Sequence, residues 1–77
     1  MRITYDPEVD ALYIRFIETT VTTEHVAEGI AIDYTPDGHI AGIEILDAHQ
    51  RFGDPEVFRK VILEEIVWAT PTAAAQS

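Results

Sequence analysis

The alternation of apolar and polar residues predicts strands over the first two thirds of the chain. Residues 1–5 and 11–17 alternate, and the second run is rich in β-branched and aromatic residues. Residues 24–34 and 39–48 show the same pattern, so we expect about four strands. Because the connections between these runs are short, the strands should form an antiparallel sheet of hairpins or a meander.

The turn between the last two predicted strands, TPDG at residues 35–38, leaves two registers open. A two-residue loop at Asp37 and Gly38 builds one continuous apolar face by pairing Tyr34 with Ala41, Ile32 with Ile43 and Ile30 with Ile45. A loop that also includes Pro36 shifts the pairing by one residue, and such a shift exchanges the buried face. Turn chemistry favours the longer loop and hydrophobic matching favours the shorter one. Of the two we favour the apolar match.

Two glycines lie inside predicted strands. Gly29 suggests a bulge or a close approach of two backbones. Gly42 lacks a side chain where an aromatic ring can cross the strand, and Tyr13 or Tyr34 is the expected neighbour.

Residues 54–69 change to a helical period. Asp54 is a good N-cap, and Pro55 suits the first helical position. Phe58, Val61, Ile62 and Ile66 recur at helical spacing, and Thr70-Pro71 would end the helix. We therefore predict one α+β domain over residues 1–69, with this C-terminal helix packed on one face of the sheet, and a flexible tail over residues 70–77.

One helix covers one face of a sheet, so the other face should stay open. The apolar residues expected on that open face are Tyr13, Ile17, Ile40 and Leu46. An uncovered apolar face usually marks an interaction site, and we therefore expect a homodimer or higher oligomer formed through it. Trp68, at the predicted helix end, is a further interface candidate, although it serves equally well to cap the small core.

The charge composition limits the classes of binding partner that we expect. The 77 residues contain 14 acids and 5 bases, a formal charge of −9. Direct binding to nucleic acid is not expected because it needs clustered Lys and Arg, whereas a basic protein suits this charge. The plainer interpretation is that the acidity keeps a small protein in solution. There is no cysteine, no apolar run of membrane-spanning length and no signal-peptide pattern, so we expect a cytoplasmic protein.

Asp6, Glu8 and Asp10 alternate in the manner of a calcium-binding loop. Such a loop needs Gly at its sixth position and Glu at its twelfth, and counting from Asp6 these positions hold Ala11 and Ile17. A turn is therefore favoured, in which Asp6 and Asp10 accept local backbone N–H groups.

A second polar cluster contains Glu44, Asp47 and His49, with His25 expected near the same end of the hairpin. These residue types can bind zinc or iron, or act as an acid and a base, which gives the alternative hypothesis of a small enzyme. The histidines lack the tight spacing of most metal sites, and no pattern defines a substrate pocket. We therefore predict no catalytic residues, no bound metal and no cofactor.

Two stretches, ITYDPEVDALYI and EGIAIDYTPDGHIAGIEILDA, resemble the small bacterial family called domain of unknown function 2283. The resemblance covers about residues 3–48, and the family brings no catalytic residues because no activity is assigned to it. Some relatives are encoded beside small toxin-like proteins, which implies an antitoxin-like role. We expect a non-enzymatic protein-interaction module that neutralises a basic partner. The alternatives are the small enzyme and a structural homodimer.

Overall fold

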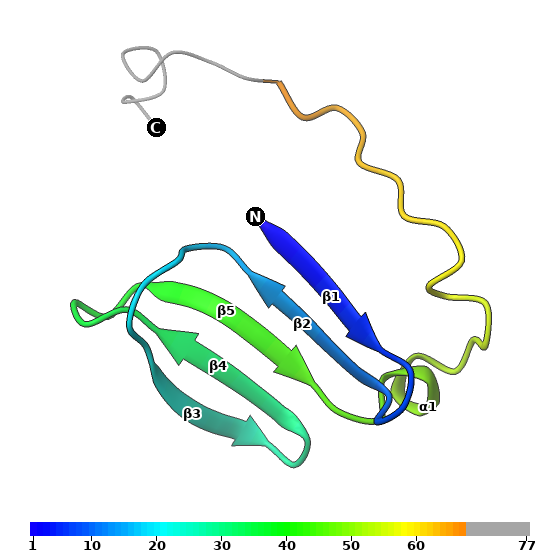
Figure 1. Ribbon diagram of the computed structural model, residues 1–77, viewed down its shortest axis with the longest axis horizontal. Coiled ribbons are helices and arrows are strands. Elements are labelled where there is room, and N and C mark those ends of the chain that lie inside the picture. The colour runs from blue at the N-terminus through cyan, green and yellow to red at the C-terminus, as the bar shows by residue number, and fades with distance from the viewer. Residues whose placement is uncertain (68–77) are drawn as a thin grey trace.

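The computed structural model describes residues 1–67, which form a five-stranded antiparallel sheet and one short helix (Figure 1). The elements are β1 (Arg2–Asp6), β2 (Ala11–Arg15), β3 (Thr22–Ala27), β4 (Ile30–Tyr34), β5 (Ile40–Ile45) and α1 (Ala48–Phe52). The strand order is β1-β2-β5-β4-β3, so β5, the last strand in the sequence, lies at the centre. The predicted α+β class with an antiparallel sheet is confirmed, with one strand more than expected.

The additional strand comes from the run at residues 24–34. It forms two strands, β3 and β4, joined by a tight turn at Glu28 and Gly29. Gly29 has a φ of 79°, a left-handed conformation that glycine adopts without steric cost. The prediction of one strand was therefore wrong, because Gly29 lies in a hairpin turn. The irregularity expected near this glycine lies just before the turn, where the register shifts between His25 and Ala27.

The β4–β5 hairpin combines the two registers that the sequence leaves open. Ile32 pairs with Ile43 and Ile30 with Ile45, as hydrophobic matching predicts. Near the turn, however, Tyr34 pairs with Ile40, because the register shifts by one residue between Asp33 and Tyr34. This shift allows the longer turn to form, while the isoleucine pairs farther from the turn keep the register that hydrophobic matching predicts.

The helix prediction was wrong in position and length. Asp54 begins only a turn, in which its Oδ1 atom accepts the backbone N–H of Glu56 at 2.9 Å. No helix follows Phe52 within residues 1–67. The physical reason is that the following stretch is rich in β-branched residues, which have low helix propensity, and it packs on nothing that would stabilise a helix. Trp68, the predicted end of the domain at residue 69 and the tail at residues 70–77 lie outside the described residues.

The helix that does form, α1, lies at one end of the sheet, beside the β1–β2 turn (Figure 1). It runs between two left-handed residues, Asp47 with a φ of 54° and Gly53 with a φ of 73°. Five residues are too few to show a helical period, so the hydrophobic pattern gave no sign of it. No helix in the part of the chain that the structure describes is long and apolar enough to cross a membrane.

Cross-strand pairing sorts the side chains onto two faces, because directly paired residues share a face. We call one of them the apolar face; its rows are Tyr5, Leu12, Ile45 and Ile30, and then Ile3, Ile14, Ile43, Ile32 and Glu24. We call the other the polar face; its rows are Thr4, Tyr13, Glu44, Ala31 and His25, and then Arg2, Arg15, Gly42, Asp33 and Thr23.

The apolar face has no second layer above it. Leu12 is the only large hydrophobic residue that is buried among those described, and the isoleucines in the middle of the face are half-buried. Ile3, at its β1 edge, is 45% exposed. A sheet normally buries such a face against another layer. The face that the predicted helix was expected to cover is therefore open.

Candidate functional site

The four residues of the enzyme hypothesis do not come together. His25 and Glu44 share a row of the polar face, but Ala31 and its strand lie between them, a separation of about 10 Å for two strand spacings. Asp47 is exposed before α1, and its side chain does not cap the helix. Within residues 1–67, no three His, Asp or Glu side chains are grouped so that they could hold a metal ion.

His49 instead joins Tyr5 and Asp10 in a cluster that we call the Tyr5 cluster. The Tyr5 hydroxyl donates to Asp10 Oδ1 at 2.6 Å and lies 2.7 Å from His49 Nδ1. The backbone N–H of His49 also donates to the two Asp10 carboxylate oxygens, at 3.1 and 3.2 Å. The predicted turn at Asp6 is confirmed, because its Oδ1 atom accepts the backbone N–H of Glu8 at 3.0 Å. For Asp10 the expectation of a local N–H was wrong, because its carboxylate accepts the N–H of His49 in α1.

The positions of the protons in the Tyr5 cluster indicate a structural role. The single hydroxyl proton of Tyr5 goes to Asp10, so the short contact with His49 requires a proton on Nδ1 of the histidine. The contact between His49 and the Asp10 carboxylate, at 3.1 Å, uses the same nitrogen. A catalytic relay uses opposite nitrogens of the imidazole ring for the nucleophile and the carboxylate. This arrangement instead fastens α1 to the β1–β2 turn.

The electrostatics of the cluster are those of a satisfied hydrogen-bond network. The hydrogen bond from Tyr5, and those from His49, hold the pKa of Asp10 below its usual value of 3.8. Partial burial and the neighbouring Asp10 carboxylate raise the pKa of Tyr5 to about 12. A tyrosine with so high a pKa stays protonated at neutral pH and is therefore a poor nucleophile or base.

Phe58 completes the cluster from the segment after α1. Its ring stacks on Tyr5, with centroids 4.0 Å apart and planes 23° from parallel, and it meets His49 edge-on at 5.2 Å. Offset stacking and edge contacts are the favoured aromatic geometries. The cluster was not predicted from the sequence, because no spacing rule connects Tyr5 and Asp10 with residues about 40 to 50 positions later.

A second network crosses the polar face and centres on Asp33, which is buried. Tyr13 donates to its Oδ2 atom at 2.5 Å and Thr23 to its Oδ1 atom at 2.6 Å, and these bonds lower the pKa of Asp33. Gly42 makes room for Tyr13, because a Cβ atom at Gly42 would lie 2.7 Å from the tyrosine oxygen. The predicted contact between Gly42 and an aromatic ring is confirmed, with Tyr13 as the neighbour.

The predicted interface residues fall in different places. Tyr13 is half-buried, and its hydroxyl is used by Asp33. Ile17 and Ile40 are 44% and 47% exposed and lie at one end of the sheet, whereas Leu46, 40% exposed, lies at the other end. Ile17, Ile40 and Leu46 therefore do not form one continuous patch. The continuous apolar surface of the sheet is the apolar face defined above. Trp68 lies outside the described residues.

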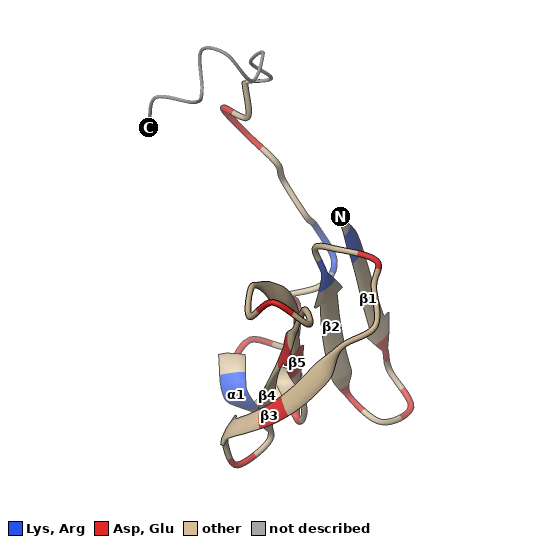
Figure 2. Cartoon of the chain, turned by 90° about the vertical axis from the view of Figure 1, so that its left-hand side faces the viewer, with Lys and Arg blue, Asp and Glu red and all other residues tan. Residues whose placement is uncertain are grey.

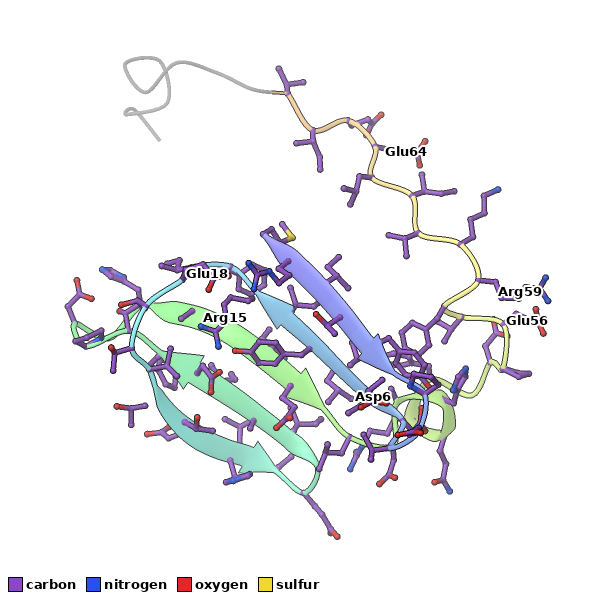
Figure 3. All side chains as sticks on the ribbon, viewed as in Figure 1. Asp6, Arg15, Glu18, Glu56, Arg59 and Glu64 are labelled. Atoms are coloured by element: carbon purple, nitrogen blue, oxygen red, sulfur yellow. The ribbon has the colours of Figure 1, made fainter. Side chains whose placement is uncertain are left out.

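Charged groups do not define a site. Acidic residues are scattered over the turns, the strands and the segment after α1 (Figure 2). Glu18 lies 3.3 Å from Arg2 and 3.9 Å from Arg15, and Glu56 pairs with Arg59 at 3.0 Å (Figure 3). Exposed pairs of this kind contribute little to stability. The described residues enclose no pocket.

Comparison with models of protein families gives a match. A family model described as a protein of unknown function, DUF2283, matches residues 2–49, which is 48 of the 77 residues. No curated protein and no solved structure matches the chain. The matched region contains all five strands, the Asp33 network, and Tyr5, Asp10 and His49 of the Tyr5 cluster. Phe58 and the segment after it lie beyond the match.

Proposed function

The chain belongs to the DUF2283 family of proteins of unknown function, and on that premise we propose that it is a non-enzymatic protein-interaction module whose binding surface is the apolar face. One observation carries the proposal: eight apolar or aromatic residues form two continuous rows on one sheet face, and within the described residues an aromatic cover is found only at its Tyr5 end, where His49 and Phe58 pack. An open apolar face of this extent is typical of a surface that binds protein.

The hydrogen bonding of the polar residues supports a role without catalysis. The Tyr5 cluster and the Asp33 network use their hydrogen-bonding groups on each other, and both hold elements of the fold together. His25 and Glu44 are too far apart to act on one small group. These observations favour the interaction module over the enzyme hypothesis.

A finer proposal concerns a second, basic partner, as in an antitoxin-like protein that neutralises a toxin. Its support is the net charge of −9, which attracts a cationic surface over a long range. The acids lie on the polar face, on the turns and at the edges, so such a partner would contact those surfaces and leave the apolar face to another occupant.

Site-specific photo-crosslinking in the native cell tests the main proposal. Positions 3 and 4 are neighbours on the exposed edge strand β1 but point to opposite faces, so they form a matched pair. A crosslinking residue in place of Ile3 should capture a protein, whether a second copy or another chain. The same residue in place of Thr4 should capture markedly less. Equal or absent capture at the two positions would refute the apolar face as a binding surface.

A further inference from the structure

We propose that the occupant of the apolar face is a second copy of this chain, with the two sheets packed face to face about a two-fold axis. This inference rests on the proposed function, since it names the partner of the same surface. A two-fold axis brings the same patch of each copy together, so the face has to be complementary to itself in both charge and shape.

The distribution of charge on the apolar face favours a second copy over a basic protein. Glu24 is the only charged residue in the two rows of the apolar face, and it lies on β3, at the edge of the sheet. A basic protein placed there would bury its cations against isoleucine, which is costly without a paired charge. Two copies bury mainly apolar groups against each other, with Glu24 at the rim of the interface. Although each copy carries a charge of −9, the acids of β1, β4 and β5, namely Asp6, Asp33 and Glu44, belong to the polar-face positions of their strands.

The size of the face excludes residues 57–67, the described part of the segment after α1, as a sufficient cover. Five strands at about 4.8 Å spacing and five residues at about 3.4 Å give a face of about 24 by 17 Å, or about 400 Å² in plan. Folded into a helix, residues 57–67 would measure only about 16 by 10 Å, or about 160 Å². More than half of the face would therefore stay open.

A second sheet of the same size matches the face. Two stacked sheets lie about 10 Å apart and interdigitate side chains from their inner faces, as in a β-sandwich. Each copy would lose at least the plan area of its face, about 800 Å² in total for the pair, before the relief of the side chains is counted. Specific interfaces bury about 1,200–2,000 Å², so the sheets supply much of what a stable dimer needs.

The segment after α1 supplies the remaining buried area that a stable dimer needs. We call residues 59–67 the arm; it begins at the rim of the apolar face, because the preceding residue, Phe58, stacks on Tyr5. Five large apolar side chains of the arm are 60–85% exposed: Val61, Ile62, Leu63, Ile66 and Val67. Figure 1 shows that the arm runs outward past the edge of β1 and does not fold back over the sheet. We place it against the second copy, where these side chains become buried.

The thin core gives an independent reason for self-association. No large side chain in the described residues is less than 2% exposed, and the buried hydrophobic residues besides Leu12 are alanines. A chain of this size has a small stability margin, and without disulfides in the described residues oligomerisation is one way to increase it. A second copy is present wherever the chain is made, so the core is completed without a further gene product.

Sedimentation equilibrium of the purified chain tests the inference. Across the micromolar range the mass should be twice the chain mass of 8.6 kDa. Ile3→Lys should weaken the dimer about tenfold or more, because a two-fold interface contains the substitution twice. Thr4→Lys adds the same side chain to the same edge strand on the polar face, and should leave the dissociation constant nearly unchanged.

Both positions are exposed in the single chain, so neither variant should lose the fold, and circular dichroism of each variant checks this. A monomer across the whole range, or equal weakening by the two lysines, would overturn the inference. If the purified chain is a monomer while a crosslinker at position 3 captures a different protein in the cell, the second copy is wrong and the proposed function stands. If position 3 also captures nothing, both are wrong.

Discussion

At the scale of single residues, Tyr5 connects three parts of the chain. Its ring belongs to the apolar face and stacks on Phe58, and its hydroxyl reaches Asp10 in the β1–β2 turn and His49 in α1. It therefore couples the end of the sheet, the helix and the start of the arm. The stability of this corner of the molecule should depend on the tyrosine hydroxyl.

The hydroxyl can be tested by Tyr5→Phe, which keeps the ring and removes its hydrogen bonds with Asp10 and His49. The melting temperature should fall by a few degrees, because Asp10 loses its shortest hydrogen bond. Tyr34→Phe is the matched control, since the Tyr34 hydroxyl makes no side-chain hydrogen bond within the described residues. An equal loss in the two variants, measured by thermal unfolding, would contradict the role assigned to the Tyr5 cluster.

The cluster also predicts the pH dependence of stability. The pKa of Asp10 is lowered in the folded chain, so its contribution is present above pH 3.8 and is lost as the pH falls through the folded pKa. The pKa of Tyr5 is raised from 10.0 to about 12, so its contribution is complete below pH 10 and is lost between pH 10 and 12. Thermal unfolding across this alkaline range should show a smaller loss in Tyr5→Phe than in the original chain. Identical alkaline profiles would show that Tyr5 ionises as it does in the unfolded chain.

Only some of these residue contacts could be predicted from the sequence. Gly42 inside an alternating strand is a local signal, and it correctly indicated the crossing of Tyr13. The contact between Asp10 and His49 depends on the left-handed turn at Asp47 and on the course of the chain after β5. A hydrophobic pattern carries no information on either, so the Tyr5 cluster could not be foreseen.

At the scale of elements, most strands were predictable because a half-buried strand needs alternation, but the hairpin within residues 24–34 was not. The sequence left two β4–β5 registers open; the isoleucine pairs adopt the one that hydrophobic matching favours, and the residues next to the turn adopt the other. The helix prediction over residues 54–69 relied on spacing alone. Spacing shows which residues would share a helix face, but a short helix forms only where that face can pack. In the single chain, residues 59–67 find no such surface.

The arm can be tested by ending the chain after Phe58, which removes the whole arm together with residues 68–77. The sheet, α1 and Phe58 remain, so circular dichroism should still show the strands. The dimer should weaken by about tenfold or more, because burial of even one large apolar side chain contributes about 1.5–3 kcal/mol. If sedimentation shows an unchanged dissociation constant, the arm does not contact the second copy.

At the scale of the whole molecule, the dimer and the basic partner predict opposite effects of salt. Two copies with a charge of −9 each repel one another, so screening should tighten the dimer as salt rises. Association with a basic protein should become slower under the same change, and its dissociation should change less. Dissociation constants of the purified chain at low and high salt measure the first effect. A dimer that weakens with salt would show that ion pairs, and not the apolar face, hold it together.

If a second copy covers the apolar face in solution, that face becomes less accessible as the protein concentration rises, and the absence of cysteine from the chain makes this change directly measurable. Ile43→Cys places a thiol in the middle of that face, and Thr4→Cys places one on the polar face as the control. The rate of reaction of each thiol with a soluble reagent is followed as the protein concentration rises through the micromolar range. We predict that the rate at position 43 falls as dimers form, while the rate at position 4 stays constant. A rate at position 43 that does not change with concentration would show that no second copy covers the apolar face.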